Sequence, residues 1–102
     1  MSKPRIELQT FLEDVLGSRN VYFQPPESFK LKYPCIIYQL ASINSRKANN
    51  VKYKTEKCYT VTLIDKNPDS EFVDKFQAIK YCNFDRFFIN DNLNHWVFRI
   101  YF

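Results

Sequence analysis

The sequence predicts one α+β domain, in which two helices pack on a largely antiparallel sheet and a long β-hairpin protrudes from that sheet. Residues 51–65 alternate apolar or aromatic side chains with charged or hydroxylic ones, which is the period-two pattern of a half-buried strand. Residues 4–16 and 67–81 instead place their apolar side chains at helical spacing. With the strands described below, these stretches predict the element order α-β-β-β-α-β-β.

The composition bounds the size and class of the protein. A chain of 102 residues corresponds to a single domain over residues 1–102, and a hydrophobic share of 45% predicts a folded chain. Aromatic residues make up 18%, which suggests that part of the aromatic surface is buried against a partner. The net charge of +4 fits either an ordinary soluble protein or one steered toward nucleic acid or an acidic protein face.

The first two elements are a helix over residues 4–16 and a short strand over residues 21–23. Pro4 suits the first turn of the helix, and Gly17 provides its C-terminal stop. Two consecutive prolines end the strand, because they force extended or turn geometry and remove two backbone donors.

The next two strands are predicted to form the hairpin. Residues 33–40 contain a continuous apolar run, and the polar stretch 41–50 joins them to the strand at 51–65. At about 3.3 Å per residue the latter strand could span about 45 Å, which a domain of this size cannot cover. We therefore expect its C-terminal end to lie in the sheet and residues 52–57 to project as an arm.

Basic residues gather on this hairpin, with Glu56 as the single acidic residue among them. They are Arg46, Lys47, Lys52, Lys54 and Lys57. A solvated hairpin explains such a cluster, and so does a contact with phosphate or with an acidic protein surface. These five are the candidate partner-binding residues.

A second helix is predicted over residues 67–81. Asn67 can cap it and Pro68 fits its first position, while acidic residues follow at the positive end of the helix dipole. Two closing strands are predicted over residues 84–89 and 95–102. The turn-rich connection at 90–94 predicts that they pair as a hairpin.

The sequence lacks the parts of a catalytic or cofactor site, so neither an enzyme nor a bound cofactor or metal is predicted. One histidine, His95, and three dispersed cysteines offer no metal-ligand spacing and no oriented nucleophile–base pair. The odd cysteine count predicts buried thiols rather than a disulfide framework. A single glycine excludes glycine-rich phosphate loops. No signal-peptide pattern or apolar run long enough to span a membrane is present, which predicts folding in the cytoplasm.

An alternative function is a small module that binds single-stranded nucleic acid. Tyr53 and Tyr59 interleave with lysines, as base stacking and phosphate contact require. Against this, the same aromatic residues have a place on the apolar face of the strand, and the glycine-containing RNP1 pattern is absent.

Several stretches carry a resemblance to a known family. They are the N-terminal helix before residues 21–26 (VYFQPP), 33–38 (YPCIIY), 59–65 (YTVTLID) with 67–70 (NPDS), and 84–86 (FDR) with 91–95 (DNLNH) and a closing aromatic strand. In this order the chain resembles the small tail terminator proteins, also called tail completion or head–tail joining proteins, of long-tailed bacteriophages and prophages.

The resemblance implies a structural protein of the virion tail or neck, made in the host cytoplasm and without catalytic residues. In that family the protomers form a hexameric ring that caps the tail tube and joins the tail to the head connector. The implied partners are therefore further copies of the chain, the tail tube protein and the connector proteins. DNA would pass through the lumen of the ring and be contacted non-specifically.

Overall fold

The computed structural model describes residues 4–48 and 51–102, and for the strand residues between 44 and 56 it describes the backbone alone. This part of the chain forms two helices and five strands in the predicted order, so the α+β class is confirmed. The elements are α1 (Arg5–Leu16), β1 (Val21–Phe23), β2 (Cys35–Ala48), β3 (Val51–Asp65), α2 (Phe72–Gln77), β4 (Cys82–Asn90) and β5 (Leu93–Tyr101).

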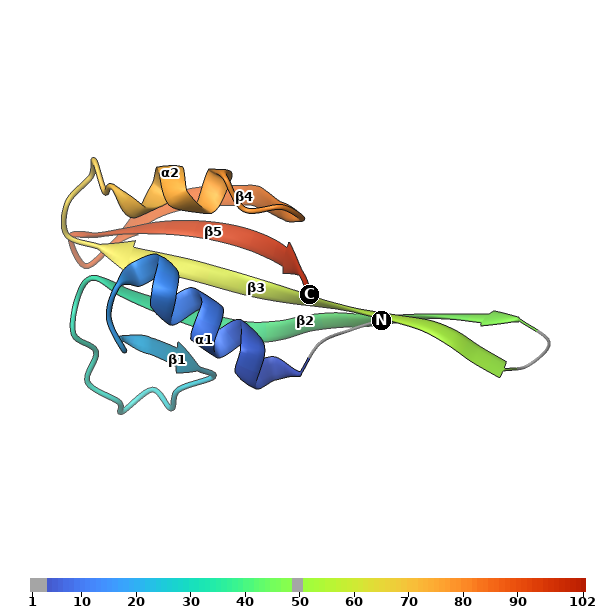
Figure 1. Cartoon of the computed structure of the whole chain (residues 1–102). Helices are drawn as coiled ribbons and strands as arrows, with labels where there is room; N and C mark the ends of the chain where they lie inside the picture. Colours follow the sequence, from blue (N-terminus) through green and yellow to red (C-terminus); the bar gives the residue numbers. More distant parts are fainter. Residues whose placement is uncertain (1–3, 49–50) are drawn as a thin grey trace.

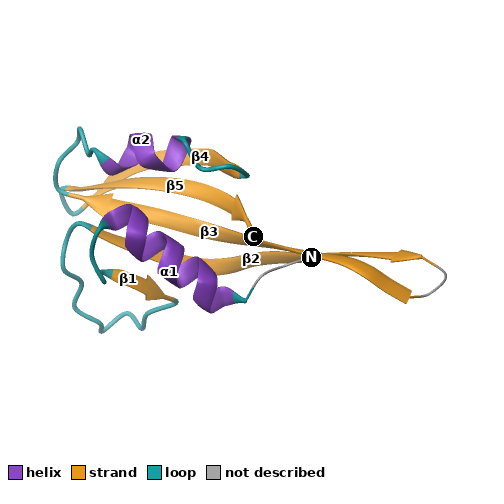
Figure 2. Cartoon of the chain, viewed as in Figure 1, coloured by secondary structure: helices purple, strands orange, loops and turns teal. Residues whose placement is uncertain are grey.

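The strands form one sheet in the order β1-β2-β3-β5-β4 (Figure 1). β1 runs parallel to β2, and the other neighbouring pairs are antiparallel. Both helices cover the same face of the sheet, because Tyr38, Val61 and Phe98 lie opposite one another in the register and belong to one buried cluster with residues of α1 and α2 (Figure 2). The core therefore lies between this face and the two helices.

α1 follows its prediction closely. Leu8, Leu12 and Leu16 are buried at a spacing of four residues, which places them on one side of the helix. Gly17 ends the helix with a φ of 73°, a conformation that glycine adopts without a steric penalty, and its N–H donates to Glu13 O at 2.8 Å. The helix thus packs its leucine stripe on the sheet.

The predicted arm is confirmed in the backbone of β2 and β3. β1 pairs with residues 36–38 of β2, and β5 pairs with residues 58–65 of β3. The rest of the two strands pair with each other and extend away from the body of the domain (Figure 1), and the protein including this extension measures 52 Å along its longest axis. The paired segment from Ser42 to Ala48 opposite Val51 to Cys58 is called the arm below.

The prediction that residues 41–50 are a polar connection was wrong for most of its length. β2 continues to Ala48, and the turn-forming residues of this stretch pair with β3. Cross-strand pairing with a long strand of high β-propensity overrides the local preference of serine and asparagine for turns. The remaining two residues of the predicted connection, 49–50, lie outside the described part of the chain.

The second helix is shorter than the predicted 67–81. Instead of capping a helix, Asn67 Oδ1 accepts a hydrogen bond from the Asp69 N–H at 3.0 Å, and Asp65 Oδ1 accepts one from the Asn67 N–H at 3.1 Å. The turn at Asn67 occupies the side chain that would have capped the helix. α2 starts at Phe72, and Tyr81, at a φ of 63°, has already left the helical conformation.

The closing hairpin is tighter than predicted. β4 and β5 are joined by a two-residue turn, Asp91 and Asn92, with φ angles of 52° and 62°. These are the positive angles of a turn whose twist matches that of the paired strands. Both strands therefore reach further into the predicted connection at 90–94 than expected, and β5 ends at Tyr101.

The packing of α2 on the sheet rests on Phe76. Its side chain is completely buried, and its ring stacks on Phe98 with 4.7 Å between centroids and 10° between planes.

Phe76→Ala is expected to lower the free energy of unfolding by about 3–5 kcal/mol, because it leaves a cavity in the core. Urea denaturation measures this. Gln77→Ala, an exposed change on the same helix, is the control, and a similar loss in both variants would contradict this account.

Candidate partner-binding surfaces

The first candidate surface is the arm, which contains all five predicted basic residues, four of them beyond the body of the domain and one at its base. The backbone register places Arg46 opposite Lys54 and Lys47 opposite Lys52. The structure thus brings four basic residues that are separated in sequence into one short section of the hairpin. Lys57 lies at the base of the arm, where it is half-buried and its carbonyl oxygen accepts a hydrogen bond from the Phe102 N–H at 3.0 Å.

The arm accounts for the whole net charge of the protein. Residues 44–57 contain five basic residues and one acidic residue, which is a net charge of +4. The chain contains 15 basic and 11 acidic residues, so the remaining 10 basic and 10 acidic residues cancel. The rest of the chain is therefore neutral overall, and the surplus positive charge lies on a thin two-stranded projection.

The second candidate surface is the edge strand β4, which sequence reasoning did not identify. β4 is the last strand of the sheet, and within the described chain it pairs with β5 on one side. Phe84, Phe87 and Ile89 are 52%, 45% and 65% exposed, and Phe88 on the opposite face is 38% exposed. Strand β4, with its outer backbone and these four apolar side chains, is called the β4 edge below. The high aromatic content hinted at such a surface, but the sequence pattern did not reveal which strand is the edge.

The cysteines are poor candidates for chemistry. Burial raises the pKa of the Cys35 thiol from 9.0 to about 12, with a further contribution from the charge of Asp65. Burial likewise raises the pKa of Cys82 to about 11. Because the thiolate is the reactive form, both groups are unreactive at neutral pH. Cys35 and Cys58 are buried, as predicted, whereas Cys82 is half-buried.

The side chain of His95 contacts other residues of the β4–β5 hairpin. Its ring stacks on Phe88 at 4.5 Å between centroids, and its Nδ1 lies 3.0 Å from the carbonyl oxygen of Leu93. The described residues contain no group of three or more histidines, cysteines and carboxylates that could hold a metal ion. The histidine thus belongs to the β4–β5 hairpin rather than to a ligand cluster.

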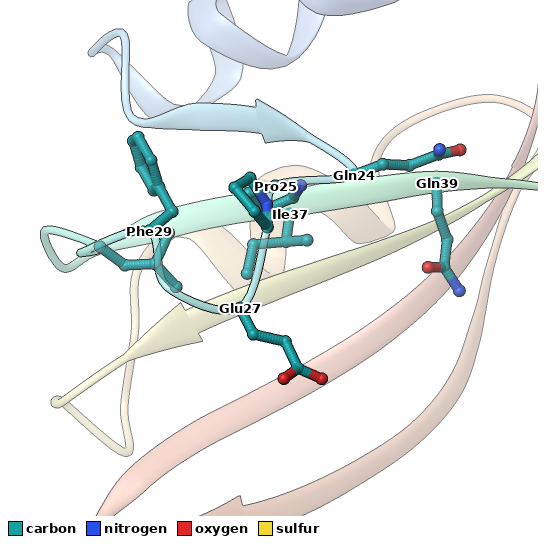
Figure 3. Close-up of a pocket in the computed structure, with 8 residues that line it drawn as sticks. Gln24, Pro25, Glu27, Phe29, Ile37 and Gln39 are labelled. Carbon is teal, nitrogen blue, oxygen red and sulfur yellow. The ribbon is translucent and has the colours of Figure 1, made fainter.

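A shallow cavity of about 240 Å³ lies between β2 and the loop that follows β1 (Figure 3). Its lining consists of Gln24, Pro25, Pro26, Glu27, Phe29, Leu31, Ile37 and Gln39. Figure 3 shows the single carboxylate of this set, on Glu27, pointing away from Pro25 and Phe29. The lining is mostly apolar, and it brings together no pair of titratable groups that could perform acid–base chemistry.

No protein-family model matches the chain, and no curated protein matches it. Neither helix in the described part of the chain is long and apolar enough to cross a membrane.

The buried thiol of Cys35 makes folding stability depend on alkaline pH. Its pKa is near 9 in the unfolded chain and about 12 in the folded protein, so between these values the folded state keeps a proton that the unfolded state has lost. The resulting stability is fully present below pH 9 and disappears as the pH approaches 12. Burial also raises the pKa of Tyr38, which adds a loss of the same sign above pH 10.

We expect urea midpoints to fall as the pH rises above 9, and Cys35→Ala to flatten this fall. The neighbouring exposed change Gln39→Ala is the control and should leave the slope as it is. An unchanged slope in the Cys35→Ala variant would show that this thiol is not responsible.

Proposed function

We propose that the chain is a structural subunit of a bacteriophage tail, which forms a ring on the end of the tail tube and joins the tail to the head connector. The arm carries this proposal. A projection with the whole net positive charge, on a neutral body, serves to contact a partner that is not part of its own domain. The resemblance to tail terminator proteins, stated above from the sequence, supplies the type of assembly.

The charge of the arm specifies the chemistry of its partner. Like charges at directly opposed positions of an antiparallel pair disfavour that pair, and the register opposes Arg46 to Lys54 and Lys47 to Lys52. A negatively charged surface on a neighbouring subunit or on the tail tube would remove this cost. The arm therefore fits an acidic protein surface as its partner.

The shape of the subunit supports assembly into a ring. A ring closes when one surface of each subunit contacts a different surface of the next. The arm projects from one end of the sheet and leaves the body of the same subunit behind it (Figure 1), so it meets a neighbour rather than its own domain. The result would be a repeated head-to-tail contact between identical subunits.

Reversing the four charges of the arm tests its role. The variant Arg46→Glu, Lys47→Glu, Lys52→Glu and Lys54→Glu is expected to fold normally, since these residues lie beyond the strands that pair with the body. It should reduce tail joining at least tenfold in a head–tail complementation assay, because it replaces attraction by repulsion at several contacts. Lys30→Glu and Lys66→Glu, on the body, are the control. Normal joining by the arm variant would refute the assignment.

The native mass of the purified protein tests the ring. We expect a closed species of about six subunits, formed alone or on addition of tail tube, because the resemblance to tail terminator proteins implies a hexamer and repeated heterologous contacts can close a ring. A protein that never forms such a species under either condition would contradict the proposal.

The alternative function is a module that binds single-stranded nucleic acid. Titration with single-stranded DNA at several salt concentrations distinguishes this function from that of a ring protein. That module predicts binding by a monomer that weakens steeply as the salt concentration rises, because counterions are released from the phosphates. If the protein forms a ring and uses the arm for protein contacts, we expect no salt-dependent binding of single-stranded DNA by the monomer.

A further inference from the structure

The β4 edge leaves unpaired strand backbone beside exposed apolar side chains. β4 is nine residues long, and its outer side pairs with no strand in the described part of the chain. Natural proteins protect such edges, because an exposed apolar strand is a template for pairing with another chain. Four large apolar side chains on this strand are 38–65% exposed, so a cover over the β4 edge would bury substantial apolar surface.

The sequence of β4 is complementary to itself in one antiparallel register. If Asp85 lies opposite Arg86 of a second copy, the two-fold symmetry repeats the pair, and two opposite-charge contacts form at the centre. The same register brings Phe84 opposite Phe87 of the second copy and Cys82 opposite Ile89 of the second copy. Each of these apolar pairs also occurs twice.

This register also agrees with the face on which each side chain lies. Phe84 and Phe87 are opposite Phe98 and Trp96 of β5, which are buried under the helices, so both phenylalanines lie on the helix-covered face. Arg86 is opposite Val97. Val97 lies between Trp96 and Phe98 in β5, so its side chain and that of Arg86 are on the other face, which the helices do not cover.

Asp85 belongs with Arg86 on the helix-free face. It is the extra residue at the irregularity between Phe84 and Arg86, and its Oδ2 lies 3.9 Å from Nε of Arg99. Arg99 neighbours Phe98 in β5 and therefore points to the face opposite the helices. The Asp85–Arg86 pair between two copies would thus form on one face, as a cross-strand contact requires.

Neighbouring registers lose this match. A shift by one residue in one direction places Arg86 opposite itself, and a shift in the other direction places Asp85 opposite itself. Both shifts put like charges together at the centre. They also oppose residues from different faces, because a one-residue slip moves every side chain to the other side of the sheet. The charge pattern therefore favours a second copy of this chain over a strand of unrelated sequence.

We propose that the β4 edge pairs antiparallel with the β4 edge of a second copy, with Asp85 opposite Arg86 of that copy, and joins two sheets into one of ten strands. This contact uses the same surface on both subunits. It is therefore separate from the head-to-tail contact that closes a ring, and it does not depend on the arm. The two helices of each copy would lie on one common face of the joined sheet.

Charge exchange at the centre of the contact tests the register. Analytical ultracentrifugation of the full chain from micromolar to millimolar concentration is expected to show that the chain associates through this contact as its concentration rises. Asp85→Arg or Arg86→Asp alone should weaken it about tenfold, because each turns two attractive pairs into like-charge pairs. The double variant Asp85→Arg with Arg86→Asp should restore association. Circular dichroism of each variant confirms that the fold is intact.

A cross-link tests the same register independently. Ile89→Cys places a thiol opposite Cys82 of the second copy, at the Cα separation of about 4.5–5.5 Å that opposed residues have and a disulfide needs. Oxidation is carried out at about pH 9, where the introduced exposed thiol is ionised and can start the reaction although most of Cys82 is still protonated. Diamide accepts the two thiol hydrogens, and a covalent dimer should form. Ile89→Cys combined with Cys82→Ser is the matched control and should stay uncross-linked.

Each outcome decides the proposal. A dimer that both single reversals weaken and the exchange restores supports it, as does the cross-link. A protein that shows no β4-dependent association at any concentration, or an exchange variant as weak as the single variants, overturns it and leaves the β4 edge free for a strand of another protein. The arm variant with four reversed charges should keep this pairing, so a failure of the proposed tail function and a failure of the β4 contact are distinguishable.

Discussion

The antiparallel pairing of β2 with β3 is the constraint on which the rest of the structure depends. Within the body, β3 is paired on both sides, by β2 and by β5, and its residues Tyr59, Val61 and Leu63 contribute to the core. Beyond the body the two strands pair only with each other in the described chain. The same pair of strands therefore both centres the sheet and forms the arm. A change in their register would displace the side chains of the core.

The ladder is interrupted where the arm leaves the body. A register shift lies between Leu40 and Ser42, opposite Tyr59 and Cys58, which is also where the pairing of β3 with β5 ends. An extra residue at such a point bends the strand and increases its local twist. Ala41 is the extra residue of β2 at this point, so it bends the strand at the end of the body, where the arm begins.

Behind this junction, Tyr38 connects the sheet to α1. Its hydroxyl accepts a hydrogen bond from Arg5 Nη1 at 2.9 Å and donates one to Gln9, whose Nε2 donates to the carbonyl oxygen of Val21 at 2.9 Å. The Arg5 guanidinium also lies 4.4 Å above the ring of Phe23. These contacts join α1 to β1 and to β2, the strand that continues into the arm, so the base of the arm is attached to the helix layer.

The sequence by itself determined the element types, their order and the existence of the arm. The period of two in residues 51–65, the leucine spacing of α1 and the stop at Gly17 are local signals that tertiary packing did not overturn. It also supplied the five basic residues of the hairpin. What the tertiary structure decided was long-range: pairing with β3 extended β2 to Ala48, Asn67 formed a turn instead of a cap, and β4 became the exposed edge. A residue's own neighbours in sequence carry propensity, whereas strand order and edge exposure depend on which distant segment supplies the hydrogen bonds.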